Sequence, residues 1–250
     1  MSNVVALADV QGTKEQLGTP GNEIWRTHFL KPVPGTGEPQ AFLIEYAPAR
    51  ILRTHFHDVD EFQIVVSGDG MLGKHAIGPF DIHFASAFTP YGPLVAGAQG
   101  LSFLTLRAYR DSAGPQFWPG NRLVLSDLHG RDPWQVFQKV DLLERGGSLV
   151  SKSLTHLTGR CGLAGWVVTV PPRVSMPLPA APGPCGQYAV VVDGSIRIES
   201  RTLQAPIIGF AASGEMPLTI TSGKEGAALI VLNFPESDAI GGLQQREPVV

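Results

Sequence analysis

The sequence contains an internal repeat at an offset of 126 residues, and this repeat limits the possible folds more than any other feature. The offset aligns EFQIVVSG (residues 61–68) with QYAVVVDG (187–194), and it places Gly100 on Gly226. The matches continue without a gap over about forty residues, which predicts two copies of one structural unit. Each copy would occupy about 110–125 residues, an ordinary domain size.

Short apolar runs, separated by turns of Gly, Pro, Asp and Ser, predict that each copy is built from β-strands. A content of 29 Gly and 21 Pro, with 16% charged residues, suits short strands better than long solvated helices. We therefore expect an all-β fold. The expected strands span residues 41–46, 61–66, 71–75, 80–85 and 101–109 in the first copy, and 165–170, 187–192, 195–198, 205–210 and 227–234 in the second.

One segment between the two copies predicts a helix. WQVFQKVDLLER (residues 134–145) carries apolar side chains at helical spacing. We expect a first domain over residues 1–120, a linker containing this short helix over 121–160, and a second domain over 161–250.

Charge and hydropathy argue against several classes of partner. The net charge is −3 and no basic block is present, so we expect no nucleic-acid partner. No apolar run approaches the ~18 residues of a membrane span, and the N-terminus lacks a secretory pattern, so we expect a cytoplasmic protein. Cys161 and Cys185 lack CxxC spacing and are expected to be reduced thiols, with a single disulfide as the alternative.

The most specific segment is THFHDVDEFQIVVSG, residues 54–68. His55 and His57 are two residues apart, so on an extended strand both side chains point to the same face. Glu61 follows a turn-like stretch and opens the next strand, whose antiparallel return brings it beside the pair. Two imidazoles and one carboxylate form a facial site suited to Fe(II), Mn(II), Ni(II) or Zn(II).

This segment resembles the first motif of the cupin superfamily, in which an HxH pair, three or four residues, a Glu, six residues and a Gly follow one another. His55, His57, Glu61 and Gly68 fit this pattern. Residues 78–93 are similar to the second cupin motif. Asp81 occupies its opening position, but Tyr91 stands where that motif has a His.

The resemblance implies two tandem cupin barrels, which are jelly rolls, and one divalent transition metal, with Fe(II) favoured. It covers residues 40–110 strongly and 165–235 weakly. In the second copy the corresponding ligand positions hold residues that are poor metal ligands. A single metal site is therefore implied, in the N-terminal barrel, with His55, His57 and Glu61 as ligands. The four residues in the second copy are Ala181, Gly183, Gln187 and Pro217.

Other side chains are candidates for roles around this site. Tyr91 is a fourth ligand, a hydrogen-bond donor to substrate or an aromatic filler, and His83 is a hydrogen-bonded barrel histidine or a replacement ligand. Gln63 shares the strand face of Glu61 and is a candidate for orienting substrate or water. Tyr91 or His83 would serve as acid or base. Arg53 and Arg107 are candidates for contact with an anionic substrate, but charges of this kind are more commonly exposed at strand edges, and we expect that here.

Three functions are compatible with these residues, because a fold does not determine a reaction. The first is a non-haem Fe(II) dioxygenase that cleaves a C–C bond of a small oxygenated or aromatic substrate. The second is a Mn- or Zn-dependent isomerase, lyase or hydrolase of a small carbonyl or carboxylate compound. The third is a non-catalytic small-molecule binder. Exposed sheet edges in cupins also lead us to expect a homodimer.

Overall fold

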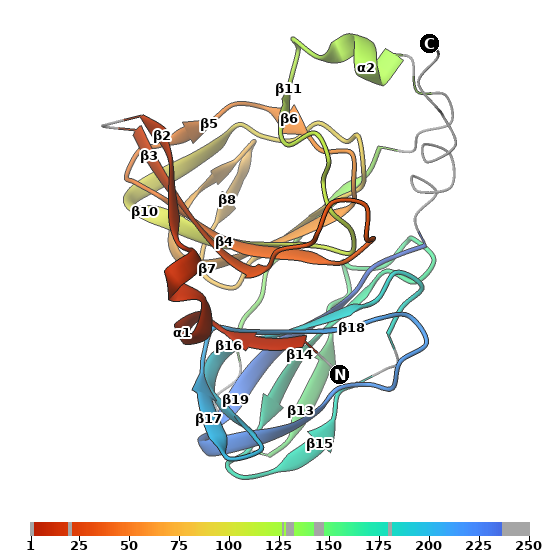
Figure 1. Cartoon of the computed structure of the whole chain (residues 1–250). Coiled ribbons are helices and arrows are strands. Elements are labelled where there is room, and N and C mark those ends of the chain that lie inside the picture. The colour runs from red at the N-terminus through yellow and green to blue at the C-terminus, as the bar shows by residue number, and fades with distance from the viewer. Residues whose placement is uncertain are drawn as a thin grey trace. The chain divides into compact units, whose positions relative to one another are not determined.

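The computed structural model describes residues 3–19, 22–126, 128, 133–142, 148–179 and 182–236 (Figure 1). Strands dominate these residues, which confirms the predicted all-β class. The described residues form two compact units. The N-terminal unit contains residues 16–25 and 32–137, and the C-terminal unit contains residues 3–15, 26–31 and those from 138 to 236.

Within the described residues, the first large sheet has nine strands in the order β12-β9-β7-β10-β4-β3-β2, with β5 on β10 and β8 on β7. A separate small pair joins β6 (His55–Phe56) to β11 (Gln116–Phe117). The nine strands are β2 (Glu15–Thr19), β3 (Asn22–Leu30), β4 (Gln40–Tyr46), β5 (Ile51–Leu52), β7 (Glu61–Leu72), β8 (His75–Ile77), β9 (Ile82–Ala85), β10 (Leu94–Arg107) and β12 (Gln135–Gln138).

The second sheet has eight described strands in the order β1-β18-β16-β19-β14-β13, with β15 on β19 and β17 on β16. The first strand of the chain belongs to this sheet, because β1 runs antiparallel to β18 and sets Val4 opposite Gly209 (Figure 1). The strands are β1 (Asn3–Ala6), β13 (Val150–Ser153), β14 (Ala164–Val170), β15 (Ser175–Pro177), β16 (Gln187–Ile198), β17 (Arg201–Gln204), β18 (Ile207–Ala211) and β19 (Thr219–Asn233).

The predicted repeat is confirmed by the strand positions. An offset of 126 residues places β7 on β16 from end to end and the last residue of β10, Arg107, on the last residue of β19, Asn233. Gly68 and its partner Gly194 both have positive φ, +75° and +82°. A side chain at Gly68 would place its Cβ 2.2 Å from the carbonyl oxygen of Gly100, so the close approach of β7 and β10 requires glycine here.

The helix predicted over residues 134–145 is wrong. Residues 135–138 form β12, which pairs with β9, and residues 143–147 lie outside the described residues. The backbone of Trp134 explains the difference, because its carbonyl accepts a hydrogen bond from the Ser86 amide at 2.9 Å and its amide donates to Ser86 Oγ at 2.9 Å. These contacts hold the segment extended against its local periodicity. The described helices are α1 (Leu7–Val10), a 3₁₀ turn (Gln11–Thr13) and α2 (Arg122–Ser126).

Each unit has an apolar core of its own. Phe42, Val65 and Phe103 belong to the core of the N-terminal unit, and Val191 and Leu229 to that of the C-terminal unit. No helix in the described part of the chain is long and apolar enough to cross a membrane.

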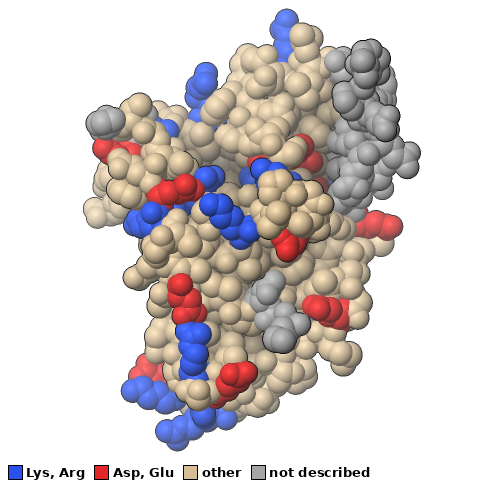
Figure 2. Space-filling model, in the orientation of Figure 1, with Lys and Arg blue, Asp and Glu red and all other residues tan. Residues whose placement is uncertain are grey.

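The structure also shows the distribution of surface charges and the state of the two cysteines. Acidic and basic side chains are mixed on the face shown in Figure 2. Cys161 is exposed, Cys185 is half-buried, and both are free thiols, so the structure contains the expected reduced cysteines and not the alternative disulfide.

Candidate functional site

The three predicted ligand residues lie close together in the N-terminal unit and are buried. The exposed fractions of His55, His57 and Glu61 are 2%, 7% and 1%. His55 begins β6 and Glu61 begins β7, so the turn between these strands brings the side chains together. The rings of His55 and His57 have centroids 5.1 Å apart, and His57 Nε2 lies 3.9 Å from Glu61 Oε2.

Both imidazoles use Nδ1 in a hydrogen bond to an oxygen. His55 Nδ1 lies 2.9 Å from the carbonyl oxygen of Arg53, and His57 Nδ1 lies 2.7 Å from Asp111 Oδ2. A carbonyl or a carboxylate oxygen accepts, so each Nδ1 donates, and in a neutral ring Nε2 then keeps its lone pair. Burial lowers the pKa of His55 to about 4, so this ring is neutral at pH 7. Metal-binding imidazoles are commonly oriented by partners of this kind.

The Glu61 carboxylate is held from both sides. Its Oε2 accepts hydrogen bonds from Arg107 Nε at 2.9 Å and Arg107 Nη2 at 2.7 Å, while its Oε1 accepts one from the Tyr91 hydroxyl. Burial alone would raise the pKa of Glu61, but the attraction of His57 in its protonated form, the charge of Arg107 and these hydrogen bonds outweigh it and lower the pKa to about 2. Glu61 is therefore ionised at neutral pH.

Arg107 is not the exposed strand-edge charge that we expected. It is 4% exposed, and its Nη1 donates to Asp111 Oδ2 at 3.0 Å and to Gln40 Oε1 at 2.9 Å. The attraction of Glu61 and Asp111 outweighs the effect of burial and raises the pKa of Arg107. The prediction failed because one carboxylate, Glu61, is distant in sequence and the other, Asp111, lies in the irregular loop that follows β10.

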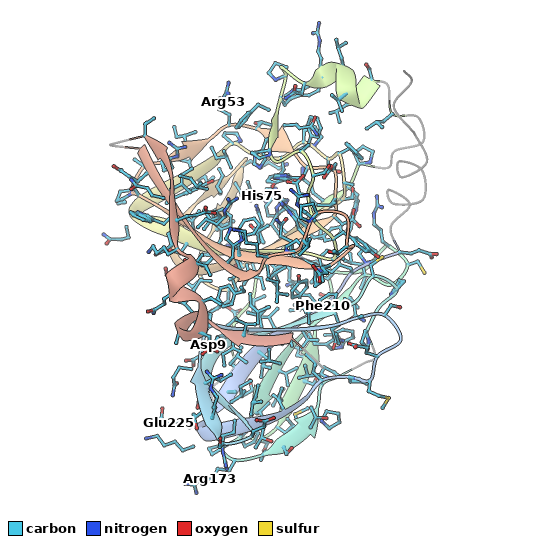
Figure 3. All side chains as sticks on the ribbon, in the orientation of Figure 1. Asp9, Arg53, His75, Arg173, Phe210 and Glu225 are labelled. Carbon is cyan, nitrogen blue, oxygen red and sulfur yellow. The ribbon has the colours of Figure 1, made fainter. Side chains whose placement is uncertain are left out.

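Arg53 is an exposed residue, as expected (Figure 3). Its guanidinium lies 4.6 Å from the ring centroid of Phe117. Asp111, by contrast, was missed altogether. Its spacing of four residues from Arg107 was the available signal, and that spacing is too common to identify a buried pair.

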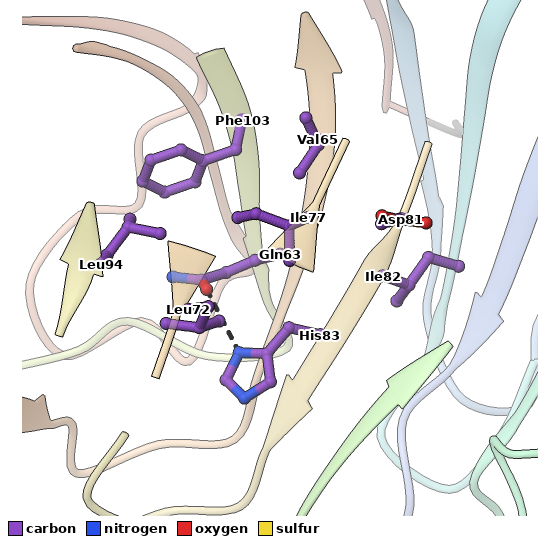
Figure 4. Close-up of a pocket in the computed structure, with 9 residues that line it drawn as sticks. All are labelled: Gln63, Val65, Leu72, Ile77, Asp81, Ile82, His83, Leu94 and Phe103. Atoms are coloured by element: carbon purple, nitrogen blue, oxygen red, sulfur yellow. Dashed lines mark hydrogen bonds between the residues drawn. The ribbon is translucent and has the colours of Figure 1, made fainter. Parts of the chain in front are cut away.

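The residues proposed for acid, base or orienting roles form one hydrogen-bonded chain. Gln63 Nε2 donates to the Tyr91 hydroxyl at 3.3 Å, and Gln63 Oε1 lies 3.2 Å from His83 Nδ1 (Figure 4). The other ring nitrogen of His83 lies 3.2 Å from Gln135 Oε1. Burial lowers the pKa of His83 to about 4, and burial together with the charge of Glu61 raises the pKa of Tyr91 well above its ordinary value. Tyr91 therefore carries a proton at pH 7.

The cavity next to these hydrogen-bonded side chains is small. A cavity lined by Gln63, His83 and Phe103, among others, has a volume of about 10 Å³ (Figure 4). A single water needs roughly 10–15 Å³ by this measure. This cavity thus has room for about one water.

The side chains suit a divalent transition ion in their chemistry, but one contact would have to change. Among the described residues, no group of three or more His, Cys, Asp or Glu side chains is already spaced to hold an ion. The Nε2 atoms of His55 and His57 are suitable donors. Glu61 can join them only by giving up its contact with Tyr91 or Arg107.

The C-terminal unit has a neutral pair where the N-terminal unit has charges. Gln187 and Asn233 occupy the positions of Glu61 and Arg107, and Gln187 Nε2 donates to Asn233 Oδ1 at 2.8 Å. Both amides are buried. The charged site is therefore a property of the N-terminal unit.

Comparisons with known proteins support the architecture. No family model and no curated protein sequence match the chain. A mutant of Bacillus subtilis oxalate decarboxylase matches with TM-score 0.60 and 13% identity over 93% of this chain and 77% of that chain. Lactobacillus farciminis oxalate decarboxylase, in a formate complex, matches with TM-score 0.56 and 12% identity over 94% and 86%. The bacterial pirin YhhW from Escherichia coli, in complex with nickel(II), matches with TM-score 0.61 and 11% identity over 94% and 100%.

Proposed function

We propose that this chain, which has the cupin fold in two tandem barrels, is a metal-dependent enzyme with a single site in its N-terminal unit. The observation that carries the proposal is the pair of buried imidazoles, His55 and His57, each with Nδ1 bound to an oxygen and Nε2 left for another partner. Together with the ionised carboxylate of Glu61 they would hold one ion, with Fe(II) favoured and Mn(II), Ni(II) or Zn(II) as alternatives.

A bound ion would supply redox or Lewis-acid chemistry, and the protein's own residues would prepare the site for it. Asp111 and the Arg53 carbonyl orient the two imidazoles. Arg107 keeps Glu61 ionised. Tyr91 holds a proton at the Glu61 carboxylate, which makes it the candidate proton donor to a bound substrate.

Within this class we propose first a non-haem dioxygenase that cleaves a C–C bond of a small oxygenated or aromatic substrate. Two imidazoles and one carboxylate are the ligand set of many non-haem iron oxygenases, because such a set leaves positions open for substrate and dioxygen.

The second candidate is a lyase, isomerase or hydrolase that uses no oxygen. One observation favours it: the protonated Tyr91 hydroxyl lies at the site, and Gln63 and His83 extend a hydrogen-bonded chain behind it. Such a chain can deliver or remove a proton without an oxidant. Two of the structures similar to this one are decarboxylases by name.

Metal analysis of the purified protein tests the proposal. Wild-type protein should keep about one equivalent of a divalent metal after dialysis, and His57→Ala should lose it. His156→Ala is the matched control, because His156 is exposed and lies in the C-terminal unit. Failure of the wild type to take up Fe(II), Mn(II), Ni(II) or Zn(II), or full retention by His57→Ala, would show that the ligand set is wrong.

Oxygen dependence separates the two reaction classes. A dioxygenase should consume O₂ with candidate enols or catechols only when iron is loaded. Turnover that continues without oxygen and follows Mn or Zn content would instead favour the second class. Substrate binding that survives removal of the metal would point to a non-catalytic binder.

We further propose a cytoplasmic homodimer that acts on a small molecule. Light scattering coupled to size-exclusion chromatography measures the mass directly. A mass of 26.7 kDa, that of one chain, would exclude the dimer.

A further inference from the structure

We propose that the C-terminal unit binds a neutral, mainly apolar small molecule inside its barrel, independently of the charged site in the N-terminal unit. A cavity of about 570 Å³ lies within this unit. Small-molecule sites are usually concave, mostly apolar and roughly 300–1,000 Å³ in volume. The cavity therefore has the size of a binding site and not of a packing defect.

The cavity occupies the same place in the repeat as the nearly filled one in the N-terminal unit. Its lining residues Ala189, Gly209 and Leu229 correspond, at the offset of 126 residues, to Gln63, His83 and Phe103. Each replacement exchanges a larger side chain for a smaller one. These three differences open the barrel, and they are separate from the exchange of Glu61 and Arg107 for Gln187 and Asn233 that removes the charged site.

The inner wall of the cavity is apolar. Its lining includes four deeply buried aliphatic side chains with exposed fractions of 2% or less: Val191, Ile196, Ile207 and Leu229. An apolar cavity of this kind does not hold water well, because water needs two to four polar partners there. An apolar ligand loses little by entering it and replaces contacts that the wall otherwise lacks.

The rim sets the charge of the ligand. Arg197 and Glu199 are the charged residues among those that line the cavity, and both are exposed. Their opposite charges largely cancel at the opening, so neither an anion nor a cation is favoured. The N-terminal strand completes the wall with Val4, which pairs opposite Gly209 of β18. These features favour a neutral ligand over a charged one.

Two substitutions that fill the cavity test the proposal with the neutral fluorophore Nile red. Leu229→Phe introduces the side chain found at Phe103, and Ala189→Leu adds bulk on β16. Gly209 is unsuitable, because an added Cβ would lie 2.9 Å from Leu218 Cδ1. Wild type should show one saturable site, and each filling variant should bind at least tenfold more weakly.

Leu149→Phe is the matched control, because Leu149 is 47% exposed, belongs to the same unit and does not line the cavity. It should bind Nile red as the wild type does. His57→Ala should also keep full affinity, so the outcome does not depend on the proposed metal site. Unsaturable binding to the wild type, or equal affinity in the filling variants, would refute the proposal.

Hydrogen exchange of the wild type decides the matter if the filling variants do not fold. Bound Nile red should protect amides in β16 and β19, which line the cavity, and leave β7 and β10 of the N-terminal unit unchanged. Protection confined to β7 and β10 would overturn the assignment.

Discussion

Replacing Arg107 by Asn should destabilise the N-terminal unit by about 3–5 kcal/mol, the usual cost of removing one partner of a buried ion pair. Arg107 is 4% exposed and donates two hydrogen bonds to Glu61 Oε2 and one to Asp111 Oδ2. An asparagine has neither the charge nor the length to replace them. Glu61 would then be buried without its cation, and its pKa would rise.

The lowered pKa of Glu61 points in the same direction. Its value of about 2 lies below the ordinary 4.5, and this difference corresponds to roughly 3 kcal/mol of stability at neutral pH. A carboxylate with a lowered pKa contributes its full share above pH 4.5 and loses it as the pH falls towards 2.

The C-terminal unit supplies the compensating variant. Glu61→Gln combined with Arg107→Asn reproduces the neutral pair of Gln187 and Asn233, whose side chains are joined at 2.8 Å. The double variant should lose at least about 2 kcal/mol less unfolding free energy than the two single variants lose in sum, since no charge is left unpaired at position 61. Recovery should be incomplete, because Asp111 still loses Arg107.

Urea unfolding of the four proteins in a Trp166→Phe background measures this cycle. The other tryptophans, Trp25, Trp118 and Trp134, lie in the N-terminal unit, so their fluorescence reports on that unit alone. A loss below about 1 kcal/mol for Arg107→Asn, or additivity within about 0.5 kcal/mol, would refute the coupled buried pair.

Three further predictions concern single residues. Gly68→Ala should cost about 3 kcal/mol in urea unfolding, because φ is +75° and its Cβ would lie 2.2 Å from a backbone oxygen, whereas Gly78→Ala, with no atom within 4 Å, should cost little. The pKa of His83 is about 4 in the folded protein, so the imidazole is protonated in the unfolded chain before it is protonated in the folded one as the pH falls below 6.5. This difference should lower the unfolding free energy by about 2 kcal/mol between pH 7.5 and 5. His83→Gln should abolish this part of the pH dependence in unfolding titrations. Asp111→Asn should weaken metal binding, measured by competition with a chelator, by about 10–100-fold, because Asp111 orients His57, and unchanged affinity would exclude this role.

Short-range patterns in the sequence determined the architecture and the centre of the site. Alternating apolar residues and turns predict strands locally, and an offset repeated along the chain predicts two copies of one β-unit without any knowledge of contacts. The spacing of His55, His57 and Glu61 also depends only on strand geometry and one turn. The structure has most of these strands where they were expected, and it brings the three ligand side chains together. The strand predicted over residues 71–75 is wrong, because residues 73–74 form the turn between β7 and β8.

Only the tertiary structure decided the features that depend on contacts between residues far apart in sequence. Trp134 starts an extended segment because Ser86, far away in sequence, binds its backbone, and local periodicity carries no trace of that contact. Arg107 is buried because Glu61 and Asp111 surround it, and an isolated strand cannot reveal whether a charge has such partners. The open C-terminal barrel likewise depends on which side chains from separate strands face one another. Secondary structure follows from neighbours along the chain, whereas burial, pairing and cavities follow from neighbours in space.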